Sequence, residues 1–291
     1  MPTKLLKWSW LAVAAALLLA ATSHAQITSV QEHEWLNSPA ATSHVGKLAG
    51  NAKAGAADYR RYCVGCHGDL GDGNGENAQW LDPKPRDFTL GIFKCRSTPT
   101  GTLPTDQDLY DTIGRGLDRS NMPTWNTLTK QERADLVAWV KHFSPRFQKE
   151  KPGPPIEIPA EPEVTPERVK AGQEVFARVQ CWKCHGVEGM ANGPSASTLT
   201  DDLSRPILPY NFTDGSRPKC GATDPDIYRI FMTGLDGTPM PSFSDNIKPD
   251  EAWDLVFYLR TLQPHNAFNS KERQIAKQLG LKPVNPNAPT Q

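Results

Sequence analysis

The sequence has no excess of charge of either sign and comparatively few apolar residues. Among its 291 residues there are 32 basic and 32 acidic side chains, so the formal net charge at pH 7 is zero. A nucleic-acid-binding protein needs a basic patch or stripe, and none is present. Hydrophobic residues make up 38% of the chain, which is enough for small cores, particularly if something other than protein fills part of them.

A long apolar run is also missing everywhere except near the N-terminus. Lys4 and Lys7 precede the apolar residues 11–21, which are followed by Ser23-His24-Ala25. A charged start, a short apolar stretch and a small-x-small site are typical of a secretory signal peptide. The run is shorter than the roughly 20 residues that a membrane-spanning helix needs. We therefore predict a cleaved signal peptide at residues 1–25, export to the periplasm and no stable membrane anchor.

Cysteine is scarce, and the spacing of the six cysteines is informative. Four of them lie in two motifs of the same form, CVGCH at residues 63–67 and CWKCH at residues 181–185. A zinc site would usually need two such pairs close together in each domain. A thioredoxin-like dithiol would lie between a strand and a helix, and no strands are predicted here. CxxC followed directly by His is instead the attachment signal of haem c.

The spacing within this signal follows from haem chemistry. One helical turn sets the two cysteines at the right separation for their thiols to add to the two vinyl groups on one side of a porphyrin. The next residue, histidine, then projects under the ring and coordinates the iron. The sequence therefore predicts two haem c cofactors. The predicted attachment and ligand residues are Cys63, Cys66 and His67 in the first motif and Cys181, Cys184 and His185 in the second.

The two motifs belong to a longer internal repeat. Their histidines are separated by 185 − 67 = 118 residues, and similar residues flank both motifs. Self-similarity at a fixed spacing indicates duplicated structural units. The matching segments are 52–68 with 169–186, 108–125 with 226–243, and 136–143 with 255–262. The predicted organisation is an N-terminal arm at 26–50, a first domain at 51–148, a proline-rich linker at 149–166, a second domain at 167–265 and a C-terminal tail at 266–291.

Both copies of the repeat carry helical patterns only. Thr105-x-x-Asp108 and Thr223-x-x-Asp226 resemble capping boxes at the start of a second helix, and Thr129-x-x-Glu132 opens a third helix. Long loops rich in Pro, Gly, Asp and Asn connect these helices. We therefore predict an all-α fold with about three main helices in each copy, in which a large apolar group completes a thin protein core.

Each copy also has a methionine that could be the second axial ligand of a six-coordinate iron. Met122 and Met240 lie 122 − 67 = 55 and 240 − 185 = 55 residues after the motif histidines. Each is followed by proline, in a loop between the second and third helices. A single methionine usually fills a core, but the equal spacing in both copies favours ligation. We therefore predict Met122 and Met240 as iron ligands.

Each copy resembles a class I cytochrome c domain, with CxxCH on the first helix, a C-terminal helix and a Met-Pro loop between them. The pair resembles the tandem di-haem members of that family. The resemblance implies an electron carrier rather than an enzyme, because His and Met would occupy both axial positions of each iron. It also implies redox proteins as partners: a dehydrogenase or quinol-oxidising complex as donor, and an oxidase or reductase as acceptor.

Two alternatives stay open from the sequence. A di-haem enzyme such as a thiosulfate dehydrogenase resembles this layout but uses a cysteine thiolate on its active haem, a role that Cys95 or Cys220 could take. The other alternative is a fixed cytochrome subunit of a larger oxidoreductase complex, with the arm at 26–50 and the tail at 266–291 as docking segments.

Cys95 and Cys220 are left over after haem attachment, at matching places in the two copies. Each domain has only one of them, so a disulfide within a domain is impossible. A disulfide between the domains would clamp them together, and it requires Cα atoms roughly 4.4 to 6.8 Å apart. Free thiols and ligation of iron by a thiolate are the alternatives to this bond.

Overall fold

The computed structural model describes residues 42–266 and 269–285. The predicted signal peptide at residues 1–25 and most of the arm at 26–50 lie outside the described residues, as does the end of the tail from residue 286 onward. Both copies of the repeat belong to one compact unit that starts at Ala41. Across the described ranges, no helix combines the length and the apolar character that crossing a membrane requires.

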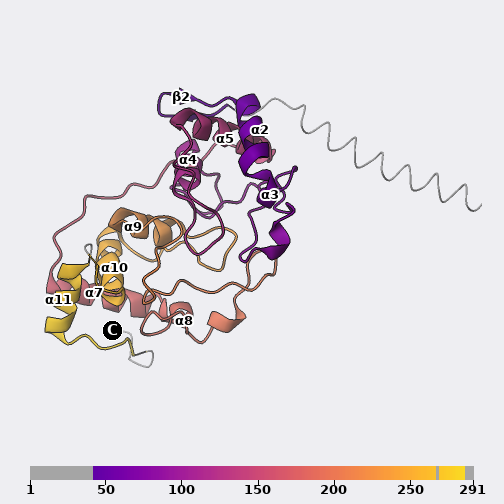
Figure 1. Cartoon of the computed structure of the whole chain (residues 1–291). Coiled ribbons are helices and arrows are strands. Elements are labelled where there is room, and N and C mark those ends of the chain that lie inside the picture. Colours follow the sequence, from indigo (N-terminus) through magenta and orange to yellow (C-terminus); the bar gives the residue numbers. More distant parts are fainter. Residues whose placement is uncertain (1–41, 267–268, 286–291) are drawn as a thin grey trace, which may run out of the picture. The chain divides into compact units, whose positions relative to one another are not determined.

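Helices dominate both copies, as Figure 1 shows, and the predicted all-α fold is confirmed. Contrary to the expectation of no strands, β1 (His44–Val45) and β2 (Leu48–Ala49) form a small antiparallel hairpin. The first copy contains α2 (Ala52–Tyr62), α3 (Val64–His67), η1 (Ala78–Trp80), α4 (Asp106–Arg115), α5 (Lys130–His142) and α6 (Arg146–Lys149). The second copy and its tail contain α7 (Pro166–Arg178), α8 (Trp182–His185), η2 (Ala196–Thr198), α9 (Asp224–Thr233), α10 (Pro249–Leu262) and α11 (Ser270–Leu279).

The helices that follow the long loops begin at the predicted capping boxes. At the start of α4, the N–H of Asp108 donates to Thr105 Oγ1 at 3.1 Å, and the N–H of Thr105 donates to the Asp108 carboxylate at 2.9 Å. The boxes at the start of α9 and α5 are formed in the same way. These bonds satisfy N–H groups that have no partner within a helix. The boxes therefore define where each long loop ends.

The predicted first helix is divided in two in each copy. α2 ends at Tyr62 and α3 begins at Val64, whereas α7 ends at Arg178 and α8 begins at Trp182. In the second copy the bend includes Gln180, whose φ of 62° is left-handed. This bend takes up the one extra residue that the second copy has before its motif, so the two motifs keep the same local geometry.

In each copy, the helix before the motif crosses the closing helix at a glycine. Gly55 of α2 faces the carbonyl oxygen of Asp135 in α5, and Gly172 of α7 faces the carbonyl oxygen of Asp254 in α10. A Cβ on either glycine would collide with that oxygen. The pairs α2 with α5 and α7 with α10 are the most extensively packed helices of the structure. The crossings therefore depend on backbone contact that only glycine permits.

Aromatic rings pack beside each of these crossings. Tyr59 and Phe143 have ring centroids 4.9 Å apart, and Phe176 and Tyr258 have centroids 5.4 Å apart. All four residues are almost fully buried. The rings thus supply a large share of the apolar contact that keeps each closing helix against the helix before the motif.

Two flanking segments, predicted as an arm and a tail, pack against the domains. Lys141 Nζ donates to the carbonyl of Thr42 at 2.6 Å, and the β1–β2 hairpin contacts α4 and α5. At the other end, α11 contacts α10 and α7, and Ile275 is 6% exposed. The tail therefore contains a helix that the sequence analysis did not predict. Over their described residues, both segments are parts of the domains that they flank.

The proline-rich linker runs between α6 and α7 without a helix and contacts both domains. The N–H of Ile156 donates to the carbonyl of Ser97 in the first domain at 2.8 Å. The indole Nε1 of Trp253 in the second domain donates to the carbonyl of Pro159 at 3.2 Å. The linker is therefore anchored to both domains.

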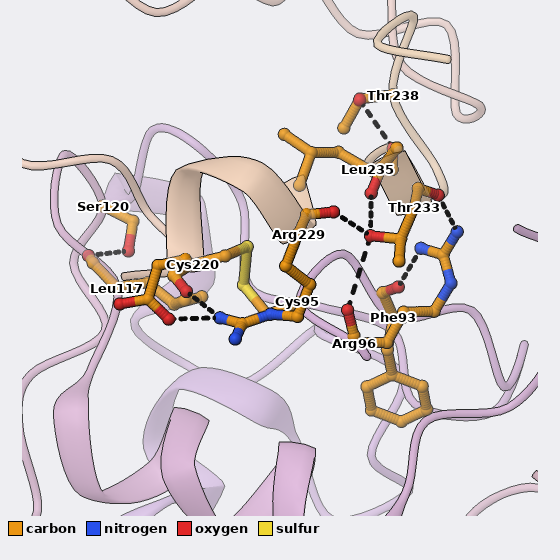
Figure 2. The surroundings of a disulfide bond; sticks show 12 residues. Phe93, Cys95, Arg96, Leu117, Ser120, Cys220, Arg229, Thr233, Leu235 and Thr238 are labelled. Carbon is orange, nitrogen blue, oxygen red and sulfur yellow. Dashed lines mark hydrogen bonds and ion pairs between the residues drawn. A yellow bond between two sulfur atoms is a disulfide. The ribbon is translucent and has the colours of Figure 1, made fainter. Parts of the chain in front are cut away.

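A disulfide and a buried arginine join the two domains. Cys95 and Cys220 are bonded, with Cα atoms 5.1 Å apart, and both are buried. Figure 2 shows Arg96, the next residue, reaching the second domain, where it donates to the carbonyl of Thr233 at 2.5 Å. The fully buried Arg96 guanidinium also pairs with Asp236 at 2.7 Å. A covalent bond and a buried ion pair therefore lie side by side at the joint.

The partner of Arg96 is itself held by the first domain. The carboxylate of Asp236 accepts from Thr100 Oγ1 at 2.7 Å and from the N–H of Gly101 at 2.8 Å. The equivalent of Arg96 in the second copy is Gly221, so this contact is made only once. Comparison of the repeats could not reveal it, because a repeat shows what the copies share and this arginine is not shared.

We expect Gly55→Ala or Gly172→Ala to destabilise the folded protein by about 1–3 kcal/mol or more, because the added methyl group overpacks a backbone contact. Gly114→Ala in α4 is the matched control, since its Cβ would meet only the end of the flexible Arg133 side chain. Denaturant unfolding of the full chain measures both. Equal stability of Gly55→Ala and Gly114→Ala would contradict this account of the crossing.

We also expect the oxidised, denatured chain to have no alkylatable thiol at positions 95 and 220. Reduction should expose two thiols, which intact mass spectrometry after alkylation detects. The double variant Cys95→Ser with Cys220→Ser is the control, because reduction should leave its alkylation unchanged. Two alkylated thiols on the oxidised wild-type chain would contradict the bond.

Candidate functional site

Each CxxCH motif forms a single helical turn. The N–H of His67 donates to the carbonyl of Cys63 at 2.9 Å, and the N–H of His185 donates to that of Cys181 at 2.9 Å. The two cysteines of each motif therefore lie one turn apart on the same short helix. Among the described residues, the disulfide joins only the pair at the domain joint, so the four motif cysteines stay available for attachment of haem.

The loop after each motif is held against the turn by equivalent hydrogen bonds. The N–H of Gly75 donates to the carbonyl of Cys66 at 3.2 Å, and the N–H of Gly193 donates to that of Cys184 at 3.2 Å. A Cβ at either glycine would collide with carbonyl groups of the motif turn. Glycine at these two positions therefore allows the loop to close over the end of the turn and satisfy its free carbonyls.

Both motif histidines are oriented through one ring nitrogen. His67 Nδ1 donates to the carbonyl of Arg86 at 3.2 Å, and His185 Nδ1 donates to the carbonyl of Tyr210 at 2.8 Å. An aromatic ring packs on each imidazole, with centroids 4.4 Å apart in the first domain and 5.0 Å apart in the second. A metal-bound histidine is typically held in this way through its other nitrogen.

The electrostatic environment keeps both imidazoles neutral. Burial lowers the pKa of His67 and of His185 below the ordinary value, and the hydrogen bond to the backbone only partly opposes this effect. Because a carbonyl oxygen can only accept, the proton of each neutral ring lies on Nδ1. Nε2 then keeps the lone pair that coordination of a metal requires.

The first thiol of each motif is poorly suited to dithiol redox chemistry. Burial raises the pKa of Cys63 to about 12, with smaller contributions from Cys66 and Asp58, and burial raises the pKa of Cys181 to about 12. Reactive cysteines have lowered pKa values instead. Within residues 42–266 and 269–285, no group of three or more His, Cys, Asp or Glu side chains is arranged so that it could hold a metal ion.

The two predicted methionine ligands occupy equivalent loops. The N–H of Leu117 donates to the carbonyl of Met122 at 3.1 Å, and the N–H of Leu235 donates to that of Met240 at 3.0 Å. A hydroxyl two residues earlier accepts from each methionine N–H at 3.2 Å. Both methionines are half-buried. The structure therefore gives Met122 and Met240 the same local geometry.

Each Met-Pro loop then returns against the helix that precedes it. Gly116 and Gly234 end α4 and α9 with φ values of 73° and 69°. A Cβ at either position would lie 2.7 Å from the backbone of Pro123 or Pro241. Glycine at the end of the helix thus allows the methionine loop to fold back closely, which fixes the position of the predicted ligand.

The residues present fit haem c. In the second domain, half-buried apolar side chains pack at the edge of the core without being enclosed by it. These side chains are Trp182, Tyr210, Met240, Phe243 and Leu262. A porphyrin would cover such an edge, with paired thiols on one turn and an oriented imidazole beside it. The thioether bonds and the ligation of iron by the methionines stay predictions.

Several residues that shape the site were not found from the sequence. The carbonyls of Arg86 and Tyr210 could not be identified, because a backbone acceptor requires no particular side chain. Phe88 and Phe212, which pack on the histidines, left a detectable signal. Both stand before threonine in matching segments of the two copies. Attention to buried aromatic residues shared by the copies could have found this pair.

Comparison with known proteins gives matches over both copies. Residues 169–263 match the cytochrome c family, and residues 50–140 match the family described as cytochrome C oxidase, cbb3-type, subunit III. Among solved structures, a chain of the Kuenenia stuttgartiensis reducing HAO-like protein complex Kustc0457/Kustc0458 is similar, with 43% sequence identity and a TM-score of 0.71. The match covers 74% of this chain and 97% of that chain. No curated protein sequence matches.

We expect Met122→Ala and Met240→Ala each to remove about half of the red-region charge-transfer band between sulfur and ferric iron, because each would remove one of two equivalent ligands. Absorption spectra of the oxidised full-length protein measure this band. Met190→Ala is the control, since Met190 is exposed and far from the matching loops in sequence. Full retention of the band in both ligand variants would contradict the assignment.

Proposed function

Because the chain belongs to the class I c-type cytochromes, with two tandem cytochrome c domains that bind haem c and transfer electrons, we propose that it is an exported carrier with two haems. The observation that carries this proposal is the duplication of the whole ligand scaffold. The motif turn, the loop that closes over it, the oriented histidine and the methionine loop occur in both copies with matching hydrogen bonds.

The side chains of each site would hold the cofactor in three ways. The paired cysteines would attach it covalently, and the histidine Nε2 and the methionine sulfur would bind the iron. The haem, when bound, supplies one-electron chemistry. A thioether ligand favours ferrous iron and therefore a higher potential. With both axial positions taken by the protein, each site suits electron transfer rather than the binding of a substrate.

The joint between the domains supports the carrier over the thiosulfate dehydrogenase alternative. That enzyme needs a cysteine thiolate on one haem, and the only cysteines outside the motifs are Cys95 and Cys220. Both are bonded to each other and buried in the structure. Neither is therefore a candidate ligand in this state.

A fixed cytochrome subunit of a larger redox complex is the second candidate function. It is favoured by the similarity to a chain of an HAO-like protein complex, at 43% identity over nearly all of that chain. In either case the partners would be redox proteins, a dehydrogenase or quinol-oxidising complex as donor and an oxidase or reductase as acceptor. The location would be the periplasm. Purification of the native protein distinguishes the two, since a free carrier elutes alone.

We expect the oxidised protein to bind cyanide slowly, because the methionine sulfur must leave the iron before cyanide can enter. The visible spectrum after mixing with cyanide measures the rate at both haems. Met240→Ala is the comparison, since removal of the ligand should open one site and accelerate binding there alone. Rapid, stoichiometric binding at one haem of the wild type would favour an enzyme instead.

A further inference from the structure

Arg86, whose carbonyl accepts a hydrogen bond from the first motif histidine, reaches the methionine loop of the other domain. The carbonyl of Arg86 accepts from His67 Nδ1 at 3.2 Å. The guanidinium of the same residue packs on Gly237, where an added Cβ would lie 2.9 Å from Arg86 Nη1. Gly237 lies in the turn between Leu235 and Met240, which a hydrogen bond of 3.0 Å closes. Arg86 therefore touches the ligand scaffolds of both predicted haem sites.

The second histidine is linked to the first domain in a corresponding way. The carbonyl of Tyr210 accepts from His185 Nδ1 at 2.8 Å. The ring of Tyr210 lies against the guanidinium of Arg119, 5.8 Å from the ring centroid. Arg119 belongs to the loop that leads to Met122. The loop behind each histidine thus contacts the methionine loop of the opposite domain.

The two contacts involve equivalent positions of the two copies of the repeat. Arg86 and Tyr210 precede the matching segments DFT and NFT, and Arg119 and Gly237 are equivalent because 119 + 118 = 237. Arg119 and Gly237 also share a left-handed backbone, with φ values of 56° and 78°. The guanidinium comes from the segment behind the histidine in one contact and from the methionine loop in the other. Both arginines belong to the first domain.

The two arginines differ in whether a carboxylate forms an ion pair with the guanidinium. Arg119 pairs with Asp214 at 2.9 Å, so its contact has no net charge. Arg86 takes part in none of the ion pairs among the described residues. Burial lowers the pKa of Arg86, the charges of Asp201, Asp202 and Asp87 oppose this effect, and the charge of Arg205 adds to it, although none of these carboxylates forms an ion pair with Arg86. Arginine nevertheless stays protonated at neutral pH, so an unpaired cation lies between the two sites.

We propose that Arg86 couples the two haem sites across the domain interface, so that its charge stabilises the reduced form of both. The inference rests on the proposed two-haem function. Reduction adds an electron to each site, and a nearby positive charge favours that state. The guanidinium lies on the methionine loop of one site and within one side-chain length of the carbonyl that holds the histidine of the other, so its charge acts on both potentials.

The test is a spectroelectrochemical titration of the full two-haem protein at low ionic strength, comparing wild type with Arg86→Gln. We expect both haems to lose electron affinity by a factor of about ten, which equals about 59 mV for a one-electron couple. The charge-transfer band should be unchanged, which separates this effect from loss of a ligand. Arg86→Lys keeps the charge, so its potentials should stay near those of wild type.

Two controls replace charged residues elsewhere, one a single cation and the other an ion pair with no net charge. Arg60→Gln removes an exposed cation of α2, and Arg119→Gln with Asp214→Asn removes the neutral pair at the equivalent contact. Neither should shift the potentials. A shift in only one haem of Arg86→Gln, no shift in either, or an equal fall in Arg86→Lys would overturn the proposal. A wild-type protein without two covalent haems would instead contradict the proposed function itself.

Discussion

The contact between a glycine and a carbonyl oxygen, made once in each domain, is the constraint on which the rest of the structure depends. At Gly55 and Gly172 the helix before the motif lies directly against the backbone of the closing helix. The CxxCH turn begins 63 − 55 = 8 residues after the crossing in the first domain and 181 − 172 = 9 residues after it in the second, so the crossing sets the position of the turn. The long loops are fixed separately, by capping boxes where α4 and α9 begin and by close glycine contacts at the motif turns and at the ends of α4 and α9.

The joint between the domains holds the two similar sites in a fixed position relative to each other. The disulfide holds the loops that follow the histidine acceptors, and Arg96 adds a buried ion pair beside it. Removing one member of a buried ion pair leaves an uncompensated charge, which is usually costly. The joint also brings each histidine loop against the opposite methionine loop. Each predicted haem site therefore has surroundings that include residues of the other domain.

Much of the chemistry could be predicted from residues close together in the sequence. The CxxCH motifs and the capping boxes depend on spacings within a few residues, whereas the methionine prediction depended on the equal spacing of 55 residues that the repeat revealed in both copies. The prediction was incomplete where the structure depends on distant backbone. The tail helix α11 buries only Glu272 and Ile275 and packs against α10 and α7, a contact that could not be inferred from the tail alone. The acceptors behind the histidines are carbonyls, which every residue has.

The sequence by itself determined the duplication and the all-α class, and it predicted the haem-binding residues, because covalent attachment and axial ligation would require particular side chains at particular spacings. It also narrowed the pairing of Cys95 and Cys220 to three possibilities. Only the tertiary structure decided among them, since a disulfide depends on the distance between Cα atoms that lie 125 residues apart in the chain. The roles of Arg96 and Arg86 were decided in the same way. Their charges matter because of what the other domain places beside them, and no local pattern in the sequence records that arrangement.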